Sequence, residues 1–219
     1  MKKMVSILTK YSPYYEKDME DYDTEGEEDE CEQLMYALIL SGLAMQMIGN
    51  SRPASCAEHQ VTHLWDMEVI NGPLDALHGE KVSVAALLVL EEYKRIAAAI
   101  TQGRCHAKPY ENEDEELLKE TFGKKGLLEE IRKENEPELL ETISPQHLEK
   151  CLNGIEEIID ELPSEQTMFR LLEKAGCAKT VYDIGLDESA VLPSLRLAPY
   201  TRRRLSLLRI SKMLDIRGE

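Results

Sequence analysis

The sequence predicts an all-α fold, a multi-helix bundle, and three observations favour it. Leu, Ala, Glu and Met are common, whereas aromatic residues make up only 5% of the chain. Apolar and amphipathic stretches of helical length follow one another, separated by Gly or Pro. No alternation of apolar and polar residues persists long enough for a strand. The 219 residues suffice for one domain with a sizeable core, alone or with a tail.

Residues 1–30 are expected to form an acidic, poorly structured N-terminal segment, and residues 31–219 the helical domain. From Asp18 to Glu30, nine of thirteen residues are acidic and none is basic. Like charges at this density repel one another and are well solvated, which favours a disordered or loosely helical connector. A metal-scavenging or partner-binding arm is the functional alternative.

The stretch from Cys31 to Ile48 predicts the first core helix. No residue from Leu34 to Gly49 is charged, and apolar side chains project on all sides, which is typical of a helix buried on every face. The stretch is short for a membrane span and follows an acidic run. Gly49, Asn50 and Pro53 would end it.

Two further core helices are expected at 54–69 and 80–101, joined by the turn Asn71-Gly72-Pro73. The three core helices would surround a cluster of histidines. The later segments are amphipathic, and Ser144-Pro145 has the pattern of a helix start. We expect these later helices at 112–121, 125–135, 145–161, 164–175, 188–197 and 199–216.

Charge and cysteine usage restrict the possible partners and the compartment. The formal net charge of −16 argues against nucleic acid and anionic membranes as partners, because both require a basic surface. The five cysteines are dispersed, which indicates reduced thiols. The short apolar stretch after Lys2-Lys3 does not form a signal peptide. The sequence therefore predicts a soluble, cytoplasmic protein.

Three of the five histidines lie between positions 59 and 78. His59 and His63 are four residues apart and share one face of a helix. His78 follows the turn, at or next to the start of the next helix. Two imidazoles brought together in this way could bind a divalent metal, although structural histidines are the alternative reading.

The sequence motifs around these histidines resemble those of the sn-glycerol-1-phosphate dehydrogenases. That family belongs to the iron-containing alcohol dehydrogenase and dehydroquinate synthase-like superfamily. The matching motifs are Ser51-Arg-Pro-Ala-Ser, Glu-His-x-x-x-His from Glu58 to His63, and His-Gly-Glu-Lys-Val from His78. Cys56 departs from the family's usual Gly. The likeness continues through Ala198-Pro-Tyr-Thr-Arg-Arg-Arg-Leu, where Arg203 departs in charge, and spans roughly residues 31–216.

The resemblance implies the fold of the superfamily's C-terminal helical domain and a metal held by His59 and His78. It also implies metal-assisted reduction of dihydroxyacetone phosphate to sn-glycerol 1-phosphate with NAD(P)H. Zinc or nickel would suit imidazole ligands. The family's third ligand, an upstream Asp, matches no residue here. Asp66 shares a face with His59, but the family does not support it as a ligand.

Several neighbouring side chains are candidates for supporting roles. His63 would orient the substrate or relay a proton, with structural packing as the alternative. Glu58 and Glu80 could hydrogen-bond the two ligands, and Ser55 could contact substrate.

A separate basic cluster, Arg202-Arg203-Arg204 with Arg209, could capture a substrate phosphate. The alternative is that it pairs with the surplus carboxylates within the chain.

A nucleotide-binding unit is not recognisable, because no strand is followed by a Gly-rich turn and a helix. The sequence therefore predicts a metal-binding domain that is inactive alone. Alternatives are a subunit acting with a separate cofactor-binding chain, and a helical binding or assembly module without catalysis. An apolar face left open by the missing domain would favour self-association.

Overall fold

The computed structural model describes residues 27–52 and 54–217, which divide after Ser55 into two compact units. Most of the expected acidic segment 1–30 lies outside the described residues. Its last four residues belong to helix α3 (Glu27–Ile48) of the first unit.

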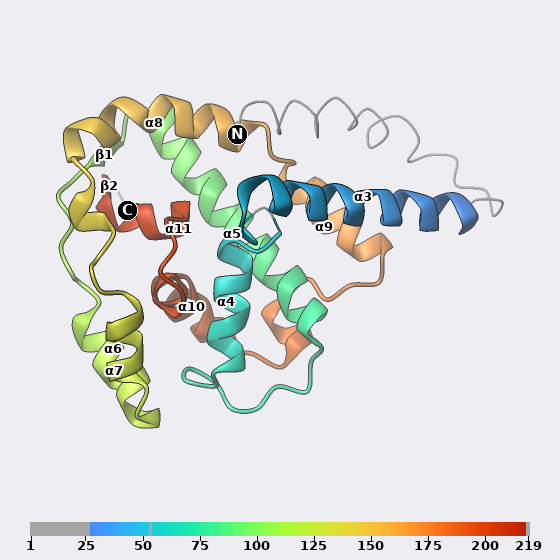
Figure 1. The fold of residues 1–219 in the computed structure, drawn as a ribbon, viewed down its shortest axis with the longest axis horizontal. Coiled ribbons are helices and arrows are strands. Elements are labelled where there is room, and N and C mark those ends of the chain that lie inside the picture. Colours follow the sequence, from blue (N-terminus) through green and yellow to red (C-terminus); the bar gives the residue numbers. More distant parts are fainter. Residues whose placement is uncertain (1–26, 53, 218–219) are drawn as a thin grey trace. The chain divides into compact units, whose positions relative to one another are not determined.

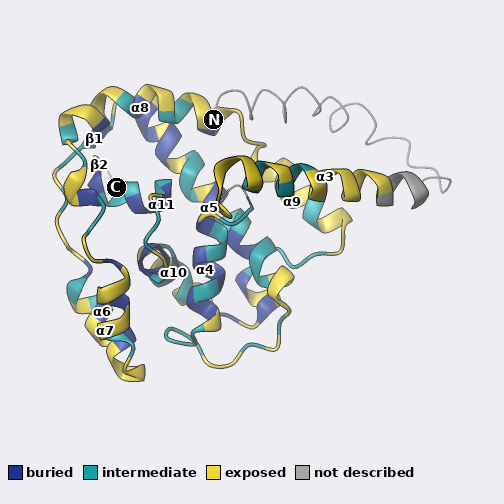
Figure 2. Cartoon of the chain, viewed as in Figure 1, coloured by how far each residue is buried: buried dark blue, intermediate teal, exposed yellow. Residues whose placement is uncertain are grey.

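The expectation that α3 is buried on every face is wrong. Met35, Leu38, Leu43 and Met47 expose half or more of their surface, and most of the helix has the colour of exposed residues in Figure 2. Hydropathy indicates the free energy that would be gained by burying an apolar side chain, but burial also requires a packing partner. Within its own unit α3 has no such partner for these side chains among the described residues, so the helix carries an exposed apolar surface.

The second unit is a helical domain organised around α5 (His78–Thr101). This helix packs against α4 (Ala57–Asp66), α8 (Pro145–Asp160) and α9 (Glu165–Lys174), and Figure 1 shows α4 beside its first half. The remaining α-helices are α6 (Glu115–Phe122), α7 (Leu128–Glu134), α10 (Val191–Leu197) and α11 (Leu207–Ile210). The all-α prediction is confirmed.

Two buried clusters form the core of this unit, and α5 contributes to both. Val84, Ala85 and Val89 join the first cluster with Leu64 and Trp65 of α4. The second cluster contains Ile96, Ala99 and Ile100, packed with Leu148 and Leu152 of α8 and with Met213. The Trp65 indole also donates a 2.7 Å hydrogen bond to Ser194 Oγ, which ties α4 to α10.

The helix-start signals are confirmed where a side chain caps the first turn. Ser144 Oγ accepts the His147 N–H, with Pro145 at the first helical position, and Ser164 Oγ accepts the Thr167 N–H. A short antiparallel pair was not foreseen: β1 (Cys105–Ala107) pairs with β2 (Leu214–Ile216), and His106 lies opposite Asp215. Three residues are too few to show a two-residue period.

The helix expected at 199–216 is wrong, because this segment is broken into short pieces. The 3₁₀ turn Ala198–Thr201 is followed by extended backbone at Arg202, then by α11, the 3₁₀ turn Ser211–Met213 and β2. The buried Gln60 side chain of α4 donates to the Arg202 carbonyl at 3.2 Å. Tertiary hydrogen bonds thus replace the helical ladder that the local sequence favours. The other 3₁₀ turns are Gly123–Lys125, Leu140–Thr142, Val181–Ile184 and Glu188–Ala190.

A buried ion-pair network fixes the C-terminal segment to the loop before α6. Asp114, whose side chain is 7% exposed, accepts hydrogen bonds from Arg196, from Lys212 and from the Tyr200 hydroxyl. Burial alone would raise the Asp114 pKa, but the charges and hydrogen bonds of Lys212 and Arg196 outweigh it, so the pKa lies below its ordinary value.

Candidate functional site

Two helices of the second unit bring three histidines together. His59 and His63 stand one turn apart on α4, and His78 is the first residue of α5. The loop 67–77 reverses the chain between them and includes Glu68 at a positive φ of 53° and the predicted turn. Because α4 and α5 pack against each other, the start of α5 faces the histidine side of α4.

The three imidazole rings lie at nearly equal separations. Ring centroids are 5.7 Å apart for His59 and His78, 6.1 Å for His63 and His78, and 6.4 Å for His59 and His63. The closest pair is the one that the sequence motifs single out as ligands. We refer to His59, His63 and His78 as the histidine cluster.

A carboxylate contacts the Nδ1 atom of each proposed ligand. Glu58 Oε1 lies 2.9 Å from His59 Nδ1 and also accepts the Cys56 N–H at 2.9 Å. Asp66 Oδ2 lies 3.5 Å from His78 Nδ1, while its other oxygen accepts the Lys81 ammonium at 2.5 Å. Both contacts leave Nε2 as the ring nitrogen that can face a ligand.

His63 has a different electrostatic environment. Burial lowers its pKa below the ordinary histidine value, and the positive charge of Arg202 lowers it further. Asp66 opposes this shift, whereas His59 and His78 add to it. The His63 ring is therefore favoured in its neutral form, in which one nitrogen donates and the other accepts a hydrogen bond.

Glu80 was expected to hydrogen-bond a histidine ligand, but it caps α5: its Oε2 accepts the Leu77 N–H at 2.7 Å. The carboxylate beside His78 is that of Asp66. Ser55 is the last residue of the first unit, and its contact with substrate stays a prediction.

The contact of Asp66 with His78 and the hydrogen bond between Gln60 and Arg202 were not foreseen. The spacing of seven residues from His59 placed Asp66 on the correct face, but no local pattern links it to His78. Gln60 and Arg202 are 142 positions apart, and only the fold brings them together.

The basic cluster divides into residues with different surroundings. Arg209 is 1% exposed and pairs with Glu138 at 3.0 Å, and Arg203 Nε donates to the Pro137 carbonyl at 2.8 Å. Arg209 thus pairs with a carboxylate, as the structural alternative predicted, whereas Arg203 binds a backbone carbonyl. Arg202 is exposed.

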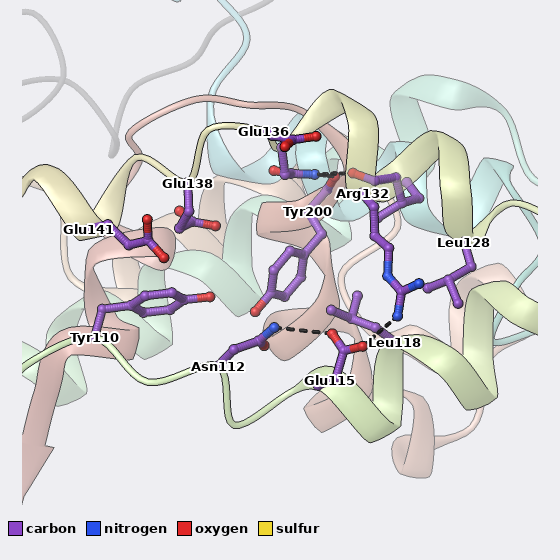
Figure 3. A pocket seen from close by; sticks show the side chains of 12 residues that line it. Tyr110, Asn112, Glu115, Leu118, Leu128, Arg132, Glu136, Glu138, Glu141 and Tyr200 are labelled. Carbon is purple, nitrogen blue, oxygen red and sulfur yellow. Dashed lines mark hydrogen bonds and ion pairs between the residues drawn. The ribbon is translucent and has the colours of Figure 1, made fainter.

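A separate pocket of about 270 Å³ lies among α6, α7 and the turn Leu140–Thr142. Figure 3 shows Tyr110 and Tyr200 there, with dashed lines joining Asn112 to Glu115 and Glu115 to Arg132. Residues of the histidine cluster do not line it. Its carboxylates include Glu115 and Glu138, which already pair with Arg132 and Arg209.

Residues 27–52 and 54–217 contain no set of three or more His, Cys, Asp or Glu side chains already arranged to hold a metal ion. The helices formed by these residues include none long and apolar enough to span a bilayer.

The fold and the site define an all-α domain in which two packed helices present three imidazoles. Glycerol-1-phosphate dehydrogenases [NAD(P)+] are similar in sequence. The Halalkalibacterium halodurans protein is 34% identical over 178 residues, 80% of this chain and 36% of the relative. The Geobacillus thermodenitrificans protein is 29% identical over 79% of this chain and 36% of the relative. That from Pyrococcus horikoshii is 41% identical over 64 residues, 29% of this chain and 18% of the relative.

The chain belongs to the glycerol-1-phosphate dehydrogenase family. It spans about a third of the length of the first three relatives. No family model and no solved structure matches it.

Proposed function

We propose that this chain is the metal-binding helical part of a glycerol-1-phosphate dehydrogenase-like oxidoreductase, with His59 and His78 as metal ligands. The observation that carries the proposal is a carboxylate beside both Nδ1 atoms: Glu58 lies within hydrogen-bond distance of His59, at 2.9 Å, and Asp66 lies 3.5 Å from His78. Histidines that bind metals almost always have their second ring nitrogen held in this way, which fixes the tautomer and directs the other nitrogen to the ion.

The donor set fits zinc or nickel. Two Nε2 atoms at about 2.1 Å from a tetrahedral ion require ring centroids roughly 5 Å apart, and the 5.7 Å between His59 and His78 is close to this value. Imidazole suits both metals. A site with two protein ligands leaves positions for a further carboxylate, water or substrate. When bound, the metal would polarise the carbonyl of dihydroxyacetone phosphate as a Lewis acid.

The remaining residues of the site would bind and orient the substrate. Neutral His63 can donate a hydrogen bond to the substrate oxygen or pass a proton to it, because the ring carries both a donor and an acceptor. Glu58 and Asp66 would hold the two ligand rings in position. NAD(P)H would bind in a separate domain or chain, so the domain should not turn over substrate alone.

Zinc and nickel binding, measured by calorimetry on the purified chain, tests this proposal. We expect micromolar or tighter binding that falls by about a hundredfold in His59→Ala and in His78→Ala. His106→Ala is the matched control, because His106 is also a half-exposed histidine beside a carboxylate, Glu149, but lies on β1. Equal affinities in the three variants would refute the assignment of the ligands.

The exposed surface of α3 favours association with another chain, either a second copy or a chain that supplies the cofactor-binding domain. Met35, Leu38 and Met47 expose 56%, 58% and 79% of their surface, and apolar surface of this kind gains free energy when it is covered. Light scattering at high concentration should therefore report self-association. A strictly monomeric protein would count against the second-copy alternative.

A further inference from the structure

Arg202 differs from the other arginines of the C-terminal cluster. Its side chain forms no hydrogen bond or ion pair with any residue that the structure describes, and it is exposed, whereas Arg203 and Arg209 are bound to Pro137 and Glu138. The extended backbone at Arg202, with φ −149° and ψ 133°, separates it from the turn before and the short helix after.

Gln60 fixes the position of this arginine relative to the histidine cluster. Its amide nitrogen donates to the Arg202 carbonyl at 3.2 Å, and its amide oxygen accepts the Ser206 hydroxyl at 2.9 Å. The Gln60 backbone carbonyl also accepts the Thr201 hydroxyl at 3.3 Å. Gln60 is 2% exposed and follows His59 directly on α4, so a buried amide holds the arginine-bearing segment against the histidine helix.

The charges around this point favour an anion. The chain as a whole carries −16, yet the Arg202 guanidinium has no carboxylate partner among the described residues, and the Arg202 backbone is held against α4 next to His59. Lys81 and Asp66 neutralise each other beside His78. A guanidinium presents a planar fork of donors that matches two oxygens of a phosphate group. An imidazole of the histidine cluster can add one further donor.

We propose that Arg202 binds the phosphate group of the substrate at the edge of the histidine cluster, and that Gln60 is the positioning residue that holds it there. The proposal rests on the proposed function for the substrate class, a small phosphate monoester. The phosphate would bind Arg202 while the rest of the molecule extends towards the three imidazoles.

Binding of inorganic phosphate to the metal-free 219-residue chain, measured by calorimetry, tests this inference. Hydrogen bonds to charged groups contribute about tenfold or more in affinity, so Arg202→Gln should weaken phosphate binding at least tenfold. Arg203→Gln is the matched control, because it changes the neighbouring charge but leaves Arg202 in place. Gln60→Met, which keeps the volume and removes the amide, should also weaken phosphate binding in a chain whose circular dichroism is unchanged.

Competition identifies the source of the phosphate. Dihydroxyacetone phosphate should displace inorganic phosphate, whereas dihydroxyacetone should not. No phosphate binding by the wild-type chain, or equal weakening in Arg202→Gln and Arg203→Gln, would overturn the inference.

Zinc binding separates this inference from the proposed function. Arg202→Gln should keep the zinc affinity of the wild-type chain, because Arg202 is not a ligand, and His59→Ala should lose it. Loss of zinc binding in Arg202→Gln would show that the arginine supports the fold of the site instead of binding phosphate.

Discussion

Replacing Asp114 by Asn should destabilise the domain strongly, because it removes one partner of a buried charge network. The side chains of Asp114 and Lys212 are 7% and 13% exposed, and the carboxylate also binds Arg196 and Tyr200. Breaking a buried pair from one side costs about 3–5 kcal/mol. Asparagine keeps the volume and one acceptor oxygen, so we expect the lower end, about 3 kcal/mol.

Urea unfolding followed by circular dichroism measures this loss. In thermal unfolding it corresponds to a decrease in Tm of roughly 6–12 °C for a chain of this size. Glu113→Gln is the control, because Glu113 is 60% exposed in its pair with Lys108, and exposed pairs contribute about 0–1 kcal/mol. An unfolding free energy for Asp114→Asn within 0.5 kcal/mol of wild type would refute the reasoning, since errors of this method are roughly that size.

The pH dependence gives a second check on the same residue. The folded pKa of Asp114 is lowered, so its contribution to stability is fully present above the unfolded value of about 3.9 and is lost as the pH falls through the folded pKa. The difference in unfolding free energy between wild type and Asp114→Asn should be constant near neutral pH and should shrink in acid below about pH 4. A difference that grows in acid would contradict this assignment.

Two further predictions concern the core and the thiols. Trp65→Phe loses the buried hydrogen bond to Ser194 and should lower the unfolding free energy by about 1–3 kcal/mol in urea titrations, whereas Tyr182→Phe at an exposed hydroxyl should change it little. Burial and the nearby Glu149 carboxylate raise the pKa of the Cys105 thiol, so a thiol reagent should label it more slowly than the exposed Cys56. Equal labelling rates in single-cysteine variants would contradict the burial of Cys105.

Local sequence patterns correctly predicted the elements that depend on residues close to one another in the sequence. The start of α8 at Ser144-Pro145 depends on a cap and a proline that lie next to each other in the sequence, and both act as expected. The meeting of His59, His63 and His78 could be foreseen because a helical spacing and one turn decide it. Their function as metal ligands stays a prediction.

The elements that were missed depend on contacts distant in sequence. Residues 199–216 have helical composition, but the buried Gln60 amide and the Asp114 network stabilise an irregular path instead. For α3, composition predicted burial, whereas exposure depends on which surfaces are present to cover the helix. Likewise, no sequence motif distinguishes the exposed Arg202 from Arg203, whose side chain binds the Pro137 carbonyl.

The shared helix α5 links the histidine cluster mechanically to the far end of the domain. Its 24 residues extend roughly 36 Å from His78 to Thr101 and pass through both buried clusters. Local unfolding of the first turn of α5 is therefore coupled to the second half of the helix, which packs against α8. The backbone amides of the two buried clusters should then exchange with deuterium at similar rates. A ligand at His78 would then slow exchange at Ile96 and Ile100, about five and six turns from the residue that it contacts.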